Sequence, residues 1–282
     1  MEKLIAMNPF QNLNSNKMNT NTNEKLHIDY SLSGTGQVTL VFIHGGFIDK
    51  EYWQYQVTYF SRNFKVLTID LAGHGKSGDN RTDWTIESLG DDVIKLIKEL
   101  SLKKVILIGH SLGGNVILEV AAKLPELVVG LVGIDNFKNA GMPLPQPLLE
   151  QISQALEYMK TNFAEVSENF ARLSLVSAHT DKQIAERVIN DYKNFKPNVG
   201  RPLLVSTFLY HDREKELLQN LKVKLHLINV DYFPTNEELL KQYAGSGYEL
   251  NLMKGTCHYP MIESPGEFNA ILEKVVSAII FS

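Results

Sequence analysis

Short apolar runs alternate with longer amphipathic stretches along most of the chain. The apolar runs lie at residues 40–43, 65–69, 104–108, 128–134, 224–228 and 248–252. Between them, stretches such as 86–100 and 114–124 place apolar side chains at helical spacing. A short apolar run is typical of a buried strand, so the alternation predicts an α/β architecture, with a mostly parallel central sheet and crossover helices.

The alternation of strand and helix patterns stops after Asn136. From Met142 onward the sequence shows successive helical patterns instead, with prolines and glycines at both ends of the stretch. These residues are Gly141, Pro143, Pro145, Pro147, Pro197, Gly200 and Pro202. We therefore expect a helical cap at 141–210, inserted into a sheet domain that consists of 25–140 and 211–282.

The first 24 residues are polar and rich in asparagine. They lack the basic start and apolar segment of a secretory signal, so we expect 1–24 to be a disordered leader. No apolar run reaches the length that a bilayer span requires. The sequence therefore predicts no membrane span and a cytoplasmic protein.

Composition narrows the possible partners and cofactors. The formal net charge of −4 comes without a cluster of lysine and arginine, so we expect no nucleic-acid partner. The single cysteine, Cys257, excludes an internal disulfide and is compatible with a reducing compartment. No carboxylate or cysteine stands at ligand spacing from the scattered histidines His27, His179, His211 and His226, so the sequence predicts no metal site.

The pentapeptide GHSLG at 109–113 directly follows the apolar run at 104–108. Its two glycines leave room for a strand to turn sharply into a helix, which places the Ser111 hydroxyl at the tip of the turn. The helix that begins near Leu112 directs its amides and its positive dipole end to the same point. The sequence therefore predicts a nucleophile elbow with Ser111 as the nucleophile.

A second glycine-rich turn, HGGF at 44–47, follows the apolar run at 40–43. Such a turn brings the backbone close to the elbow, so the N–H groups of Phe47 and Leu112 are the predicted donors of an oxyanion hole. We expect the rest of this turn to support the donors. The supporting residues are His44, Gly45 and Gly46.

Downstream, the strand pattern at 248–252 leads into a loop that contains His258, the candidate general base. The motifs of the chain together resemble those of the α/β-hydrolase superfamily, in the same order and over about 25–282. They are HGG at 44–46, DLAGHGKS at 70–77, GHSLG at 109–113, GTCH at 255–258 and PMIESP at 260–265. The resemblance implies an α/β-hydrolase fold and a catalytic triad of serine, histidine and an acid.

The resemblance leaves two candidates for the acid. In most members of the superfamily the acid follows the strand after the cap, which would be Asp231 here. That loop departs from the usual pattern, because it has no glycine and Asp231 lies only three residues beyond Ile228. A minority of members carries the acid at the end of the preceding strand, where Asp135 stands. We favour Asp135 and keep Asp231 as the alternative; either carboxylate would hold the His258 ring.

A serine at the elbow favours acyl transfer, because similar enzymes that open epoxides or remove halogens have an aspartate there. The sequence therefore predicts a serine hydrolase, without a cofactor, that cleaves a small carboxylic ester or a related acyl substrate through an acyl-enzyme on Ser111. Lactones, amides, carbon–carbon bonds and cofactor-free peroxidase chemistry stay open, as does the oligomeric state. The alternative from another class is a ligand-sensing hydrolase-fold receptor with slow or no turnover.

Overall fold

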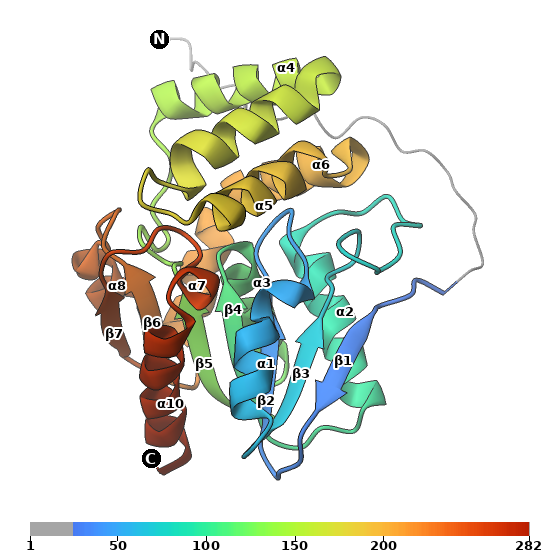
Figure 1. The fold of residues 1–282 in the computed structure, drawn as a ribbon. Helices are drawn as coiled ribbons and strands as arrows, with labels where there is room; N and C mark the ends of the chain where they lie inside the picture. The colour runs from blue at the N-terminus through green and yellow to red at the C-terminus, as the bar shows by residue number, and fades with distance from the viewer. Residues whose placement is uncertain (1–24, 282) are drawn as a thin grey trace.

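The computed structural model describes residues 25–281 of the chain. The expected leader at 1–24 lies outside the described residues, as does Ser282. Figure 1 shows a central sheet with helices on both of its faces and a further group of helices stacked above it.

The sheet of the described chain has seven strands in the order β1-β3-β2-β4-β5-β6-β7. β1 runs antiparallel to β3, and every other neighbouring pair is parallel. This confirms the predicted mostly parallel sheet, in which all six apolar runs form strands. The strands are β1 (Tyr30–Ser33), β2 (Thr39–Ile43), β3 (Lys65–Ile69), β4 (Val105–His110), β5 (Val128–Ile134), β6 (Leu225–Val230) and β7 (Tyr248–Met253).

The sequence pattern does not indicate β1. This strand lies at the edge of the sheet, its residues are mostly exposed, and its register pairs Tyr30 with Ile69 of β3. An edge strand of this kind forms by backbone pairing along one side, so it needs no run of buried apolar residues.

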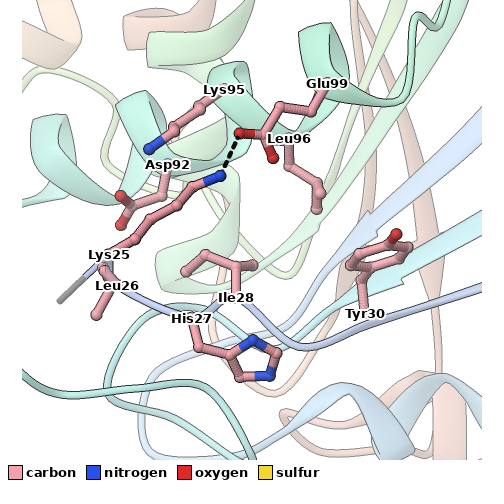
Figure 2. Close-up of a pocket in the computed structure, with 9 residues that line it drawn as sticks. All are labelled: Lys25, Leu26, His27, Ile28, Tyr30, Asp92, Lys95, Leu96 and Glu99. Atoms are coloured by element: carbon pink, nitrogen blue, oxygen red, sulfur yellow. Dashed lines mark hydrogen bonds and ion pairs between the residues drawn. The ribbon is translucent and has the colours of Figure 1, made fainter.

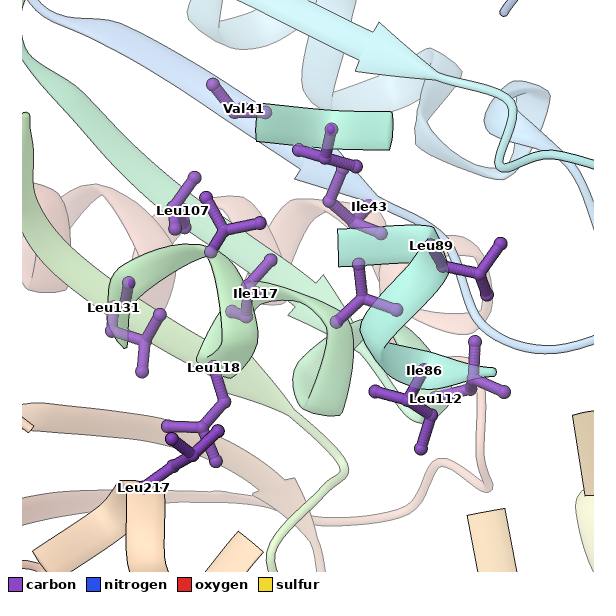
Figure 3. Packing of buried hydrophobic residues seen from close by; sticks show 14 of the residues in the cluster. Val41, Ile43, Ile86, Leu89, Leu107, Leu112, Ile117, Leu118, Leu131 and Leu217 are labelled. Carbon is purple, nitrogen blue, oxygen red and sulfur yellow. The ribbon is translucent and has the colours of Figure 1, made fainter. Parts of the chain in front are cut away.

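Two hydrophobic cores cover the two faces of the sheet. On one face, α2 (Ile86–Glu99) and α3 (Leu112–Lys123) pack on alternate residues of the strands, and on the other, α1 (Gln54–Phe60) and α10 (Pro265–Phe281) pack on the residues between them. This alternation follows from the two-residue period of a strand. Figure 3 shows the first of these cores. Its labelled side chains are Val41, Ile43, Ile86, Leu89, Leu107, Leu112, Ile117, Leu118, Leu131 and Leu217.

Helices of the insertion lie over the carboxyl ends of the strands. Phe47, just beyond β2, contacts Phe163 and Tyr192 of these helices. In Figure 1, α4, α5 and α6 stack above the sheet. Between β5 and β6 the described chain forms α4 (Gln146–Phe170), a π-helical turn (Ala171–Leu175), α5 (Lys182–Lys193), α6 (Pro197–Phe208) and α7 (His211–Asn220).

The first four of these segments fall within the expected cap, whereas α7 packs on α3 as part of the core beside the sheet. The domain boundaries 25–140, 141–210 and 211–282 stay predictions. In the described chain, the remaining short helices belong to the connections that follow β2, β6 and β7. They are the 3₁₀ helix Lys50–Trp53, α8 (Glu237–Tyr243) and α9 (Pro260–Glu263).

Candidate active site

Ser111 lies at the turn between β4 and α3, with the unusual backbone angles φ 50° and ψ −124°. Such a conformation is strained for a residue with a side chain, so the surroundings must hold it in place. An added Cβ on Gly109 would lie 2.3 Å from the Gly113 carbonyl oxygen, and one on Gly113 would lie 2.5 Å from the Ile43 carbonyl oxygen. Only glycine fits at these two positions, so the expected strand–turn–helix context of the elbow is present.

The loop after β2 lies directly against this elbow. An added Cβ on Gly45 would lie 2.7 Å from His110 Nδ1 and 3.2 Å from Ser111 Cβ. Phe47 follows in the left-handed region, with φ 64°. Within residues 25–281, the N–H groups of Phe47 and Leu112 donate no hydrogen bond to another protein group. Two unpaired amides beside a serine are suited to binding a negatively charged oxygen.

His258 and Asp135 meet at the carboxyl edge of the sheet. His258 Nδ1 lies 2.6 Å from Asp135 Oδ2, and the Asp135 side chain is 1% exposed. Because a carboxylate only accepts, Nδ1 carries the proton and Nε2 is left for another partner. Burial alone would raise the pKa of the Asp135 carboxyl, but the hydrogen bond from His258 and the charge of Lys138 bring this pKa below its usual value.

The hydrogen bonds of His258 in the described chain join Nδ1 to Asp135 and Tyr232, and its carbonyl oxygen to His110. None of them reaches the Ser111 hydroxyl. Hydrogen bonds between a nucleophile and its base are often long without substrate and tighten only in the complex. The structure therefore brings His258 and Asp135 into contact, whereas the Ser111 hydroxyl has no hydrogen bond within residues 25–281.

Asp231, the alternative acid, takes no part in the contact with His258. Its backbone N–H donates to the Met253 carbonyl oxygen at 3.2 Å, and the residue is exposed to solvent. Within residues 25–281, no hydrogen bond or ion pair joins the Asp231 carboxylate to the His258 ring. Of the two aspartates, the structure places Asp135 against His258.

Two residues that the sequence analysis missed complete the surroundings of Asp135. Lys138 Nζ lies 2.7 Å from Asp135 Oδ1, which also accepts the Val230 N–H at 3.1 Å. The Tyr232 hydroxyl lies 3.4 Å from both Asp135 Oδ2 and His258 Nδ1. The sequence signal that could have identified Lys138 is its spacing, because a lysine three residues from a candidate acid can return to it within one turn of chain.

Asn136 ties the loop after β5 to the elbow. Its Nδ2 donates to the Ser111 carbonyl oxygen at 2.5 Å, and Asn229 Nδ2 donates to the Asn136 carbonyl oxygen at 3.0 Å. These partners are 25 and 93 residues apart in the sequence. No local pattern marks either asparagine, so only the folded chain identifies them as part of the site.

Three fully buried histidines hold together the loops around Ser111. His110 Nε2 lies 2.8 Å from the His258 carbonyl oxygen. His44 accepts the Leu71 N–H at Nε2, 3.0 Å away, and its ring contacts the His74 ring. Burial lowers the pKa of all three histidines, to about 3 for His74. They are therefore neutral near pH 7 and act as hydrogen-bonding supports.

Two of the hollows in the described chain are compared by their relation to these residues. The larger, of about 320 Å³, lies where the segment before β1 meets α2 and is shown in Figure 2, with an ion pair of 2.9 Å between Lys25 and Glu99. None of the candidate catalytic residues lines it. The smaller, of about 240 Å³, lies between Phe47 and Phe195, where the loop after β2 faces the chain that follows α5. The smaller hollow thus lies beside Phe47, a candidate oxyanion donor, but neither Ser111 nor His258 lines it.

The part of the chain that the structure describes has no group of three or more His, Cys, Asp or Glu side chains that could hold a metal ion. Cys257 is free and buried, and burial raises the pKa of its thiol to about 11, so the thiol stays protonated and is a weak nucleophile. In residues 25–281, no helix is both long and apolar enough to cross a membrane.

A family model of the alpha/beta hydrolase fold matches residues 38–185, more than half of the chain. The matched region contains both glycine-rich turns, Ser111 and Asp135. A serine elbow on a mostly parallel sheet, below inserted helices, is the architecture of that class of protein. This chain belongs to the α/β-hydrolase family, as the resemblance of its motifs indicates.

Individual relatives differ in how much of the chain they match. A Haemophilus influenzae protein, whose name gives it an unverified esterase or lipase activity, is 42% identical over 96 residues, which are 34% of this chain and 33% of that protein. A karrikin insensitive 2 receptor from Petunia hybrida is 24% identical over 253 residues, 86% of this chain and 92% of the receptor. This chain thus spans about a third of the first relative and nearly all of the second.

Among solved structures, a thermophilic esterase from Thermogutta terrifontis superposes with a TM-score of 0.77. The two chains are 19% identical, and the superposition covers 90% of this chain and 94% of the esterase. At this identity the likeness shows a shared fold and gives no information about the substrate.

Proposed function

We propose that this protein is a serine hydrolase that cleaves a small carboxylic ester or a related acyl substrate through an acyl-enzyme on Ser111. The observation that carries the proposal is the 2.6 Å contact between His258 Nδ1 and Asp135 Oδ2, beside the strained turn of Ser111. A histidine whose Nδ1 proton is held by a buried carboxylate presents Nε2 as a base. In this proposal Asp135 is the acid of the triad.

In the first step, Ser111 Oγ attacks the carbonyl carbon while His258 Nε2 takes the hydroxyl proton. The carbonyl oxygen becomes an anion, which the N–H groups of Phe47 and Leu112 bind. The His258 imidazolium then gives its proton to the leaving oxygen as the bond between carbon and that oxygen breaks. Asp135 stays ionised and stabilises the imidazolium.

In the second step, a water molecule gives a proton to His258 and attacks the acyl carbon of the ester on Ser111. The bond to Ser111 Oγ breaks, and His258 returns the proton to the serine. These two steps need no cofactor.

The proposal is tested by labelling and by turnover. A fluorophosphonate probe, which phosphonylates activated serines, is expected to add one group per chain, and peptide mass spectrometry is expected to locate it on Ser111. Short-chain p-nitrophenyl esters are expected to be hydrolysed over many turnovers. Prior labelling should abolish this turnover. Labelling at another serine, or unlabelled Ser111 in a turning-over enzyme, would refute the assignment.

A second candidate function is a ligand-sensing receptor that uses the same fold. The observation that favours it is the match to the Petunia hybrida receptor, which extends over 86% of this chain and 92% of the receptor. Stopped-flow kinetics with a p-nitrophenyl ester discriminates between the two. One equivalent of p-nitrophenol per chain without further release supports the receptor, whereas a sustained steady state supports the hydrolase.

A further inference from the structure

Lys138 places a positive charge directly on Asp135. Its Nζ lies 2.7 Å from Asp135 Oδ1 and donates to the Val230 carbonyl oxygen at 3.0 Å. The Tyr232 ring covers the same ammonium group, with its centroid 4.4 Å from Nζ. The side chains of Lys138 and Asp135 are 11% and 1% exposed. Solvent ions therefore screen this ion pair only weakly.

The two oxygens of Asp135 serve two different partners. Oδ2 faces His258 Nδ1 at 2.6 Å, and Oδ1 faces Lys138 Nζ at 2.7 Å. When the His258 ring gains a proton it becomes a second cation on the same carboxylate. The two cations repel each other, so the charge of Lys138 opposes the protonation of His258.

The other groups that face the His258 ring are neutral. The ring centroids of His110 and Tyr259 lie 4.6 Å and 5.1 Å from that of His258, and the Tyr232 hydroxyl lies 3.4 Å from Nδ1. Burial holds the pKa of His110 well below its usual value and the pKa values of Tyr232 and Tyr259 above theirs. Near pH 7, the charged groups that contact the His258 ring or its carboxylate partner are therefore Asp135 and Lys138.

Two further titratable groups belong to the loop that carries His258. The Cys257 thiol is buried, which keeps it protonated. The Glu263 carboxylate accepts the backbone N–H groups of Cys257 and Tyr259, at 3.0 Å and 3.0 Å in their shortest contacts. Glu263 thus holds the backbone of the loop, and no hydrogen bond within residues 25–281 joins it to the His258 ring.

We propose that Lys138 is a positioning residue that fixes the Asp135 carboxylate through Oδ1 and, by its charge, limits how strongly the Asp135–His258 pair binds a proton. The inference rests on the proposed function, in which unprotonated His258 is the general base. The consequence is that the His258 ring stays unprotonated, and the enzyme active, at a lower pH than it would without Lys138.

The test removes the charge of Lys138 and follows the proton on His258 directly. In Lys138→Met and in Lys138→Gln, the acid limb of the kcat/KM profile is expected to move to higher pH by about one unit, the size expected for one charge lost next to a weakly screened pair. The ring ¹⁵N signals of His258, assigned with a His258→Gln variant, are expected to titrate with the same upward shift. Lys138→Arg keeps the charge and is expected to titrate as the wild type does.

A matched control is Lys103→Met, which removes the same charge from an exposed site. Lys103 lies just before β4, at the amino ends of the parallel strands and so far from the carboxyl ends where His258 lies. This variant is expected to leave both curves unchanged. If the uncharged Lys138 variants lose activity while the NMR midpoint stays at the wild-type value, Lys138 is only structural and the inference is wrong. A downward shift would also overturn it. The NMR titration needs no substrate, so an inactive wild type would refute the proposed function and leave this test intact.

Discussion

The two sides of the proposed triad are built by different means. On the elbow side, the backbone defines the geometry, because an added Cβ at Gly45, Gly109 or Gly113 would collide with neighbouring atoms. On the acid side, side chains make most of the contacts, because Asp135 is held by Lys138 and His258 as well as by the Val230 N–H. The comparison teaches that close backbone approaches produce short motifs in the sequence, whereas side-chain contacts between distant segments leave no motif.

The two sides are also joined to each other. Asn136 follows the acid directly and donates to the carbonyl oxygen of Ser111 at 2.5 Å, while His110 of the elbow contacts the carbonyl oxygen of His258 at 2.8 Å. Each side thus has one hydrogen bond that reaches into the other. Because of these bonds, a test of either side needs a substitution that removes a reacting group and leaves the hydrogen bonds between the two sides in place.

The largest expected effect breaks the elbow side alone. Ser111→Ala removes the nucleophile, so kcat/KM for a p-nitrophenyl ester should fall on the order of a million-fold. Stability should change little, because the Ser111 hydroxyl makes no hydrogen bond within residues 25–281. The urea midpoint measures this. Ser101→Ala is the matched control, since Ser101 is an exposed serine that also has a positive φ, 52°. A variant that retained a tenth of the activity would exclude Ser111 as nucleophile.

The next effect breaks the acid side. Asp135→Asn should lower kcat by about four orders of magnitude, because an amide in place of the carboxylate favours the wrong imidazole tautomer. Asp231→Asn, in the exposed loop after β6, should leave the rate near that of wild type, because no hydrogen bond or ion pair within residues 25–281 joins its carboxylate to the His258 ring. Steady-state kinetics of the two variants side by side measures the difference. If Asp231→Asn lost activity and Asp135→Asn did not, Asp231 would be the acid of the triad.

The sequence predicts the elbow side almost completely. The glycines of 44–47 and 109–113 directly follow buried strands. Three of them, Gly45, Gly109 and Gly113, are each needed at a particular close approach, so pattern and geometry coincide there. The strands themselves were predictable for the same reason, because β2 and β4 are fully buried and therefore apolar throughout. Exposed β1 gives no such signal.

The acid side was predictable only as a choice between two aspartates. The short loop around Asp231 favoured Asp135, and the structure places Asp135 at 2.6 Å from His258, across 123 residues of sequence. Lys138 and Tyr232 could not be assigned, because their positions depend on how the loops after β5 and β6 pack on each other. The π-helical turn at Ala171–Leu175 likewise has no signature in its composition.

The smallest of these effects is a dependence of stability on pH. It arises because the buried histidines around the elbow, His44, His74 and His110, are neutral in the folded chain. For His74 the pKa falls from 6.5 in the unfolded chain to about 3 in the folded chain. As the pH falls below 6.5, the unfolded state binds a proton at this histidine and the folded state does not. The free energy of unfolding therefore decreases on acidification below that pH. His44 and His110 act in the same direction, since burial lowers their pKa values as well.

Urea denaturation at pH 7 and pH 5 measures this loss. His74→Gln removes one such histidine, so the decrease in unfolding free energy between the two pH values should be smaller than in wild type by about 2 kcal/mol. His179→Gln, which replaces an exposed histidine between the π-helical turn and α5, is the matched control and should show the wild-type decrease. Equal decreases in all three proteins would contradict this prediction, because they would mean that His74 is protonated in the folded state. The packing around Ser111 would then contain a buried positive charge on the His74 ring.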